Sequence, residues 1–366
     1  MKKKLIVLTT GGSGGHVFPA EAFATAIQNK AYELAFITDK RIQNKIQGTL
    51  ATLPVYYVAA EAVTGKGILK KIIAAFKLLW GTTQSVYLLT KLKPSLVIGF
   101  GGYASLPAAL AAQFLNIPVM LHEQNAILGR ANRLLARRTR LIATSFTPTT
   151  LIPEGIKTVQ TGMPVRPAVL EKIGTPYPTD TTEFRLLVMG GSQGAKIFAS
   201  VIPAALNLLS PDLKAKLVLH QQVRPENMEQ VQEAYRNSGI KSITLSPFFT
   251  DVPALLADAH LVISRSGSSS LAEFSALGKP ALLIPLPTSA DDHQTANARV
   301  FTANGSGWLM IEKDFTPEKL AARLTELMEN PAILKRASDC ALQTAQTNAA
   351  GALAEAVEKV IKKEKS

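Results

Sequence analysis

Residues 5–20 read LIVLTTGGSGGHVFPA, a short apolar run followed by four glycines within five positions and then a helical pattern. The run LIVL is too brief for the core of a signal peptide and predicts a buried first strand. Four glycines let the backbone approach a ligand closely and direct amide N–H groups at an anion beside a helix N-terminus. The stretch lacks the third glycine of the dinucleotide fingerprint and the Lys-Ser/Thr of a P-loop, so neither nucleotide motif applies. A purely structural turn would rarely need four glycines.

The same alternation of apolar runs and helical patterns continues along the chain in two series. The first series comprises residues 5–9, 33–38, 95–100, 118–123 and 140–145, and the second comprises residues 184–190, 215–221, 242–248, 260–266 and 280–286. Continuously apolar strands separated by helices predict parallel sheets that are covered on both faces. We therefore expect an α/β fold with two Rossmann-like, doubly wound domains facing a cleft.

A length of 366 residues also favours two domains. We place the first at residues 1–165 and the second at residues 166–345. The Pro- and Thr-rich stretch 173–184 is the predicted linker, because it supports neither the helical nor the strand period. The Ala-rich tail at about 345–366 is expected to be helical and either to pack back on the first domain or to cap the second.

The net charge of +13 is confined to the first domain. Residues 1–165 carry 19 Lys and Arg against 6 Asp and Glu, whereas the rest of the chain carries 21 of each. This asymmetry predicts an anionic partner for the first half, either a membrane surface, a phosphorylated substrate or nucleic acid; a solvated basic face is the alternative. Aromatic residues make up only 6% of the chain and do not interleave with the basic positions, which argues against nucleic acid.

A basic, apolar segment lies in the middle of this half. Residues 68–89 are interrupted by three lysines, so no run reaches the roughly 18 apolar residues that a spanning helix needs, and we expect no membrane crossing. The segment nevertheless predicts an amphipathic helix. Its apolar stripe comprises Ile68, Leu69, Ile72, Ile73, Phe76, Leu79 and Trp80. Such a stripe either faces a core or lies in a membrane interface, and the surrounding charge favours the interface.

Further polar loops follow the predicted strands of the first half, where ligands of open α/β sheets bind. Residues 99–105, GFGGYAS, repeat the glycine-rich pattern, and residues 121–125, LHEQN, put polar side chains at the end of a buried strand. The next helix carries a row of arginines at Arg130, Arg133 and Arg137. Their spacing places them on one helix face, which suits a diphosphate or a solvated surface equally.

Three polar loops also follow the strands of the second half. Residues 190–195 form another strand-to-helix glycine loop. Residues 264–273 offer hydroxyls and amides for a diphosphate, with Glu273 placed to accept hydrogen bonds from ribose hydroxyls, although a serine-rich N-cap is the alternative. Residues 291–297 supply amide and carboxylate groups that suit sugar hydroxyls.

His16 is a candidate general base, because the helix start favours a neutral ring that accepts a proton; a structural histidine would occupy the same position. The sequence has no Asp-x-Asp pair and no cluster with metal-ligand spacing, so we expect neither a metal nor another cofactor. Helix N-termini and loop amides would then stabilise a leaving diphosphate. The single cysteine, Cys340, excludes a disulfide framework and fits a reducing cytoplasm.

Together these loops resemble the bacterial UDP-N-acetylglucosamine transferases that act on undecaprenyl-diphosphoryl-N-acetylmuramoyl-pentapeptide in peptidoglycan synthesis. The resemblance rests on the order and spacing of motifs at residues 11–16, 101–103, 122–125, 162–166, 190–194 and 265–267, and at Gln294 with Asn297. It implies a GT-B fold, with UDP-GlcNAc bound mostly by the second domain and the lipid diphosphate by the first. It also implies a peripheral position on the cytoplasmic face of the inner membrane, with cell-wall synthesis proteins as further partners.

The resemblance also implies roles for single residues. Those that would contact the uridine diphosphate and ribose are Ser192, Ser268, Ser269, Ser270, Leu271, Ala272 and Glu273. Phe249 would lie beside the uracil, and Gln294 would reach the GlcNAc hydroxyls. Those that would close this site from the first domain are Ser13, Gly14, Gly15, Asn125 and Arg166. The implied reaction is an inverting displacement by the muramoyl 4-hydroxyl, with His16 as the first candidate base and Glu123 as the second.

The sequence departs from the family pattern in places. Ser13 stands where threonine is familiar, and Met163 where asparagine is common. Two other functions fit the same loops: a UDP-GlcNAc 2-epimerase, and a non-catalytic module that binds a nucleotide sugar or an anionic lipid.

Overall fold

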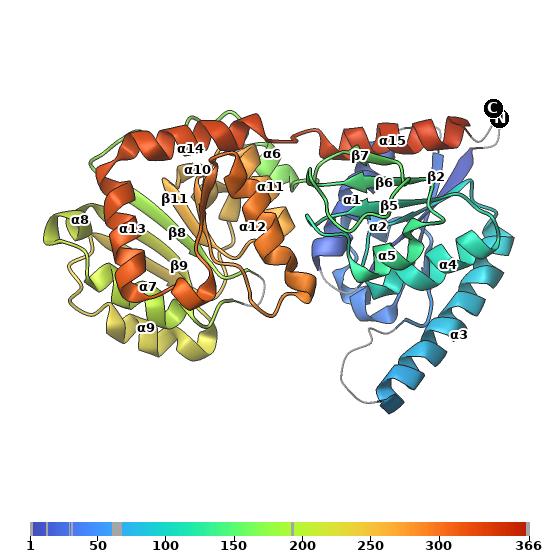
Figure 1. Cartoon of the computed structure of the whole chain (residues 1–366), viewed down its shortest axis with the longest axis horizontal. Coiled ribbons are helices and arrows are strands. Elements are labelled where there is room, and N and C mark those ends of the chain that lie inside the picture. Colours follow the sequence, from blue (N-terminus) through green and yellow to red (C-terminus); the bar gives the residue numbers. More distant parts are fainter. Residues whose placement is uncertain are drawn as a thin grey trace. The chain divides into compact units, whose positions relative to one another are not determined.

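The computed structural model describes residues 3–11, 14–28, 30, 32–60, 68–191 and 194–363. The chain forms two compact units, Met1–Arg166 with Gln346–Ser366, and Pro167–Ala345 (Figure 1). The predicted linker at 173–184 is wrong, because this stretch lies inside the second unit. Tyr177 packs against the core of that unit and donates a hydrogen bond of 2.8 Å from its hydroxyl to the carbonyl of His260.

The first unit is built on a parallel sheet of seven strands in the order β3-β2-β1-β4-β5-β6-β7. Its strands are β1 (Lys4–Thr9), β2 (Tyr32–Thr38), β3 (Val55–Tyr57), β4 (Leu96–Gly99), β5 (Val119–Glu123), β6 (Leu141–Thr144) and β7 (Thr158–Gln160). Its helices are α1 (Gly14–Ile27), α2 (Gly48–Ala51), α3 (Ile68–Leu92), α4 (Leu106–Phe114), α5 (Arg130–Ala136) and α15 (Ala349–Lys363). The five predicted strands are present. The two edge strands, of three residues each, were not predicted, although β3 begins the apolar run 55–60; β7, with the sequence TVQ, has no such run.

Both faces of this sheet are covered, which explains its continuously apolar strands. Ile6 and Leu8 of β1 pack in one cluster with residues of α1 and α15, while Val7 packs in the other with residues of α4 and α5. The C-terminal tail supplies Leu353, Val357 and other buried side chains to the first cluster, so it folds back on the first unit (Figure 1).

The second unit contains a parallel sheet of six strands in the order β10-β9-β8-β11-β12-β13. Its strands are β8 (Phe184–Met189), β9 (Leu217–Gln222), β10 (Ser242–Ser246), β11 (Leu261–Ser264), β12 (Ala281–Leu283) and β13 (Gly307–Leu309). Its helices are α6 (Pro167–Leu170), α7 (Phe198–Asn207), α8 (Pro211–Lys216), α9 (Met228–Ala234), α10 (Val252–Asp258), α11 (Ser268–Ala276), α12 (His293–Ala303), α13 (Pro317–Glu329) and α14 (Pro331–Gln343). Leu186 and Val188 of β8 pack in the core with α7 and α13.

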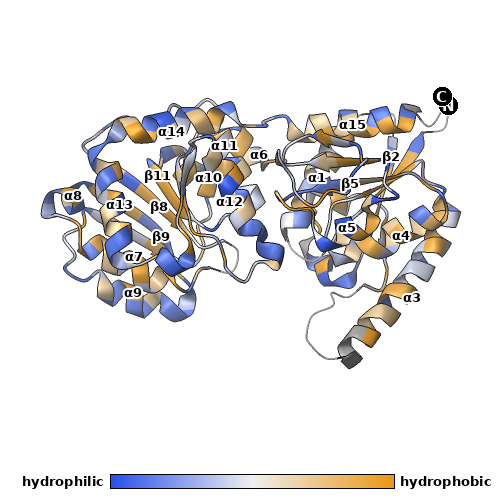
Figure 2. Ribbon diagram, in the orientation of Figure 1, coloured by the Kyte–Doolittle hydropathy of each residue, from blue (hydrophilic) through white to orange (hydrophobic). Residues whose placement is uncertain are grey.

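Helix α3 has one buried face and one uncovered apolar face. Ser85 and Leu89 are fully buried, and the helix packs along α4. The described side chains of the predicted stripe are exposed instead: Ile72 by 59%, Ile73 by 44%, Phe76 by 70%, Leu79 by 66% and Trp80 by 54%. Figure 2 shows hydrophobic residues recurring along this helix. The stripe therefore does not serve the core of this unit.

The segment Ile72–Leu92 of α3 is also long and apolar enough, by length and composition alone, to cross a bilayer. Lys77 and Lys91 are the two charged residues within this segment, whereas the three lysines at 70, 71 and 77 were the reason to expect no membrane crossing. The segment is held against the first unit by Leu78, Val86 and Leu89. These contacts belong to a helix that is packed along one side.

Candidate active site

The glycine-rich loops after β1 and β4 meet at His16, in the first turn of α1. A Cβ atom on Gly101 would lie 3.1 Å from His16 Nδ1, and one on Gly102 would lie 3.5 Å from His16 Cδ2. Both glycines have positive φ, of 82° and 76°. The hydroxyl of Thr10 donates to the carbonyl of His16 at 3.1 Å. The imidazole thus lies against the loop after β4, 85 residues or more away in sequence, while Thr10 holds the backbone of His16 at the carboxyl edge of the sheet.

These two loops also touch each other through their backbones. A Cβ atom on Gly102 would collide with the carbonyl oxygen of Gly11, and one on Gly11 would collide with the Cβ of Ala104. Glycine at both positions is therefore required by the close approach of the two loops. Close packing therefore explains part of a glycine pattern that was predicted, from the sequence, to serve anion binding.

His122, at the end of β5, is fully buried beside this site. Its Nε2 lies 3.2 Å from the carbonyl oxygen of Gly162, to which the neutral ring donates. Its Nδ1 has no hydrogen-bond partner in the described part of the chain. Burial lowers the pKa of His122 to about 4, so the ring is neutral at pH 7. This contact links β5 to the segment that leads to Arg166.

The carboxylate of Glu123 is fully engaged by its own loop. Its Oε1 accepts from the backbone N–H of Asn125 at 2.9 Å and from Asn125 Nδ2 at 3.4 Å. Its Oε2 accepts from the N–H of Gly129 at 2.9 Å and from Asn132 Nδ2 at 2.8 Å. The side chain is only 3% exposed. This geometry suits a group that fixes the loop and orients Asn125 better than a group that takes a proton from a substrate.

A buried glutamine completes this edge of the sheet. Gln124 Nε2 donates to the carbonyl of Phe100 at 2.7 Å, which ties the loop after β5 to the loop after β4. Gln124, Thr10 and Asn132 were not predicted as functional residues from the sequence. Thr10 and Gln124 are polar residues next to strand ends, but their partners Gly101 and Phe100 lie far away in sequence. Asn132 lies within α5, and nothing in its local sequence distinguishes it from a surface residue.

In the second unit, Arg265 fixes the loop after β12. Its Nη1 donates to the carbonyls of Ile284 and Pro285, both at 3.0 Å, and its Nη2 forms an ion pair of 2.6 Å with Glu312. Ser266 Oγ donates to the carbonyl of Gln294 at 2.8 Å. The structure therefore brings the predicted loops 264–273 and 291–297 together.

The N-terminus of α11 presents three half-buried serines, Ser268, Ser269 and Ser270. Its N-cap residue, Gly267, supplies no side-chain cap, and a Cβ atom there would meet nothing within 4 Å. The first-turn amides of a helix without a capping side chain are suited to an anion. Leu271 is buried, so only its backbone is available to a ligand there.

The remaining predicted contacts of this unit lie around the same edge. Gln294 Oε1 accepts from the N–H of Leu286 at 2.9 Å, while its Nε2 has no partner among the residues that the structure describes. Phe249 follows β10 with its ring half exposed and edge-on to His220, 6.1 Å away. Glu273 is buried in α11, and Ala272 is half buried beside it.

Comparison with known proteins shows the family of this chain. Residues 6–144 match the glycosyltransferase family 28 N-terminal domain, and residues 185–356 match the corresponding C-terminal domain. The UDP-N-acetylglucosamine--N-acetylmuramyl-(pentapeptide) pyrophosphoryl-undecaprenol N-acetylglucosamine transferase of Rhodospirillum rubrum is 48% identical over 96% of this chain and 91% of its own length. The transferase of the same name from Paramagnetospirillum magneticum is 48% identical over 97% and 96%. The chain belongs to glycosyltransferase family 28.

Solved structures agree with this placement. The crystal structure of Acinetobacter baumannii MurG matches with a TM-score of 0.81 and 30% identity, covering 97% of this chain and 99% of that one. The family 28 chain accordingly has the predicted GT-B fold of two Rossmann-like domains. A UDP-GlcNAc 2-epimerase from Neisseria meningitidis matches with a TM-score of 0.67 but only 16% identity, over 97% of this chain and 100% of that one, which shows a shared fold alone.

Some of the predicted site residues of this family 28 enzyme lie away from the loops described above, and others are not among the described residues. Ser13 and Ser192 are not among the residues described, whereas Gly14 and Gly15 begin α1. Arg166 is the last residue of the first unit before the chain enters the second. The predicted row of arginines is divided: Arg137 lines a polar pocket of about 500 Å³ beyond the C-terminal end of α5, at the amino ends of β5 and β6.

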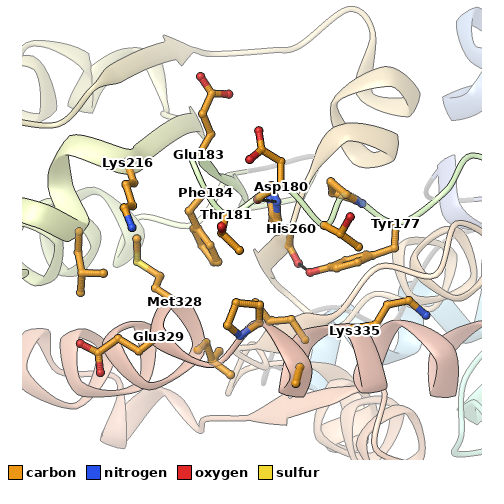
Figure 3. A pocket seen from close by; sticks show the side chains of 17 residues that line it. Tyr177, Asp180, Thr181, Glu183, Phe184, Lys216, His260, Met328, Glu329 and Lys335 are labelled. Carbon is orange, nitrogen blue, oxygen red and sulfur yellow. Dashed lines mark hydrogen bonds between the residues drawn. The ribbon is translucent and has the colours of Figure 1, made fainter.

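No group of three or more His, Cys, Asp or Glu side chains that would hold a metal ion occurs among the described residues. A pocket of about 500 Å³ does occur in the second unit, but at the amino edge of its sheet (Figure 3). There the ring of Phe184 stacks on that of His260 at 5.5 Å, opposite Met328. Because both residues precede or begin strands, this pocket is separate from the loops that follow the strands.

Proposed function

We propose that the protein transfers GlcNAc from UDP-GlcNAc to the 4-hydroxyl of lipid-diphosphate-linked N-acetylmuramoyl-pentapeptide. The reaction inverts the anomeric centre and yields the disaccharide lipid precursor of peptidoglycan. The observation that carries this function is the 48% identity, over nearly the full length of both chains, to transferases whose names state this reaction. The grouping of the motif loops at the carboxyl edge of each sheet supports it.

The second unit would bind the nucleotide sugar. The first-turn amides of α11, at Ser268, Ser269 and Ser270, would hold the diphosphate, and Ser192 would join them. Glu273 would accept hydrogen bonds from the ribose, while Phe249 would lie against the uracil. Since the amide oxygen of Gln294 is committed to Leu286, its Nε2 would donate to a GlcNAc hydroxyl. No protein-bound cation is invoked for the leaving UDP, whose charge these amides would stabilise.

The first unit would supply the base and close the site. His16 would take the proton of the muramoyl 4-hydroxyl as that oxygen bonds to the anomeric carbon and the bond to UDP breaks. Glu123 would act through Asn125, because its two carboxylate oxygens already accept four hydrogen bonds. Gly14, Gly15 and Arg166 would complete this side of the site.

The decisive experiment measures UDP release from UDP-GlcNAc in chelator, with and without a short-chain lipid-diphosphoryl-muramoyl-pentapeptide. We expect release only with the acceptor, together with formation of the disaccharide lipid. Binding without release would instead indicate a non-catalytic module. Formation of UDP-ManNAc without acceptor would indicate an epimerase, and either result would overturn the proposal.

We also propose that the enzyme is a peripheral protein of the cytoplasmic face of the inner membrane. The exposed apolar stripe of α3, including Phe76 and Trp80, would lie in the interface between headgroups and acyl chains. Burying such side chains is worth about 1.5–3 kcal/mol each. The basic excess of the first half would add attraction to anionic lipids.

A further inference from the structure

Strand β7 leaves one edge of the first sheet open. Among the described strands it pairs with β6 alone, and its three residues are exposed. The carbonyl of Lys157 accepts from the N–H of Ile142, and the N–H of Thr161 donates to the carbonyl of Thr144, both at 3.0 Å. Alternate residues of a strand direct their backbone groups to opposite sides, so the intervening residues Thr158 and Gln160 direct theirs away from β6.

No residue in the described ranges bonds to these outward backbone groups. An edge strand with unpaired N–H and carbonyl groups is a template for another strand. Proteins commonly protect such edges by covering them with a helix or loop. Here the helix beside the edge, α15, leaves a groove rather than a cover.

This groove is a cavity of about 480 Å³ between the β6–β7 edge and α15. Its apolar lining comes from Leu141 and Val159 on the strands and from Ala352, Ala356 and Val360 on the helix. Val159 is 37% exposed. An added strand would therefore find backbone partners along β7 and an apolar surface for every second side chain.

The groove is also polarised in charge. Helix α15 begins beside Gly162, because a Cβ atom added to Gly162 would lie 3.2 Å from the Cβ of Ala349. The helix ends near the amino ends of the strands, because the ammonium group of Lys4 in β1 donates a hydrogen bond to the carbonyl of Ile361. This direction brings three basic groove residues to one end: Arg140, Lys157 and Lys359. The single acidic residue that lines the groove, Glu355, lies one turn back along the helix.

We propose that this groove binds an extended segment of a partner protein, apolar at alternate positions and acidic at one end, as an eighth strand beside β7. Its backbone would pair with Thr158 and Gln160, and its acidic end would meet Lys157 and Lys359. A second copy of this chain fits less well, because it would bring another first unit with the same excess of basic charge. The site is independent of the transfer reaction, whose loops follow the carboxyl ends of the strands.

The test uses a labelled synthetic peptide, EEVTVTVG, whose binding to the full-length protein is followed by fluorescence anisotropy. We expect saturable binding that weakens at least about 10-fold in Lys359→Glu. The matched control is Lys362→Glu, which makes the same charge change at another exposed position of the same helix, outside the groove, and should bind as the wild type does. UDP release should be normal in both variants.

Backbone pairing is tested separately from charge. Two further peptides carry N-methyl groups, one at the odd-numbered residues and one at the even-numbered residues. Only one of the two should lose binding, because only every second N–H of the added strand pairs with β7. Equal affinities of the two N-methylated peptides, or an unchanged affinity of Lys359→Glu for the unmodified peptide, would overturn the proposal. A Lys359→Glu variant that lost only its affinity for phosphatidylglycerol vesicles would show a membrane contact instead, and one that only changed a dimerisation equilibrium would show self-association.

Discussion

The hydrogen bonds of Glu123 make Glu123→Gln an informative perturbation. The substitution keeps the shape of the side chain but replaces one carboxylate oxygen with an NH2 group. Two of the four N–H groups that now point at the carboxylate would then face another hydrogen-bond donor. A hydrogen bond to a charged group contributes about 1.5–3 kcal/mol, so the loss of two predicts a destabilisation of about 3–6 kcal/mol. That is a large fraction of the roughly 5–15 kcal/mol that stabilises a typical domain.

Urea unfolding followed by circular dichroism would measure this loss. Glu21→Gln is a matched control, because Glu21 also accepts from two backbone amides, of Thr49 at 2.7 Å and Leu50 at 2.8 Å, in the same unit. Its side chain is half exposed and lies away from the site, so we expect a smaller loss of stability and normal turnover.

Turnover separates positioning from proton transfer. If Glu123 orients Asn125, Glu123→Gln should raise the KM for UDP-GlcNAc and keep the pH dependence of kcat. A variant of unchanged stability would refute the structural role. A variant that kept its KM while kcat became independent of pH would make Glu123 the base.

Three further predictions concern other parts of the molecule. His16→Ala should lower kcat by about 10²–10⁴-fold with little change in UDP-GlcNAc affinity, and near-normal turnover would exclude His16 as the base. Burial lowers the pKa of His122 from 6.5 to about 4. Between these two pH values the imidazole is protonated in the unfolded chain and neutral in the folded chain, so protonation favours unfolding as the pH falls. The wild type should therefore lose about 3 kcal/mol of stability in urea between pH 7 and pH 4 through this group, and His122→Gln should lack that part of the slope. Phe76→Ser and Trp80→Ser should each weaken binding to phosphatidylglycerol vesicles about 10-fold, whereas Leu208→Ser, an exposed apolar residue of the second unit, should not; equal losses in all three would refute a specific interface.

The sheets could be predicted from sequence because buried parallel strands carry a signal that is local. Ile6, Val7 and Leu8 are all apolar since each face of β1 meets a different set of helices, and this pattern recurs in both units. The linker could not be predicted in the same way. Residues 173–184 have the composition of a loop, yet Tyr177 within them packs against the second core, a contact with partners far away in sequence.

The candidate site was predictable as a set of loops but not as a set of contacts. The motifs placed His16 and Glu123 at strand ends, where parallel topology brings loops together. Sequence could not show that the two carboxylate oxygens of Glu123 would be occupied by Asn125, Gly129 and Asn132. Nor did the spacing of the arginines show that Arg137 would line a pocket at the amino edge of the sheet. It lies there because α5 leads from the end of β5 back to the start of β6, and Arg137 is its C-cap.

The glycines illustrate why one sequence pattern can have two physical causes. In the first unit, Gly102 is required because its backbone lies against the carbonyl of Gly11, and this contact holds the loops that flank His16. In the second unit, added Cβ atoms on Gly190 and Gly194 would also collide with neighbouring atoms, whereas those on Gly191 and Gly267 would meet nothing within 4 Å. Open space beside a strand-to-helix turn is what a ligand needs to approach the backbone. The two open positions leave room for a nucleotide sugar at the second unit, whereas close packing of Gly11 and Gly102 holds the loops beside His16, the proposed base.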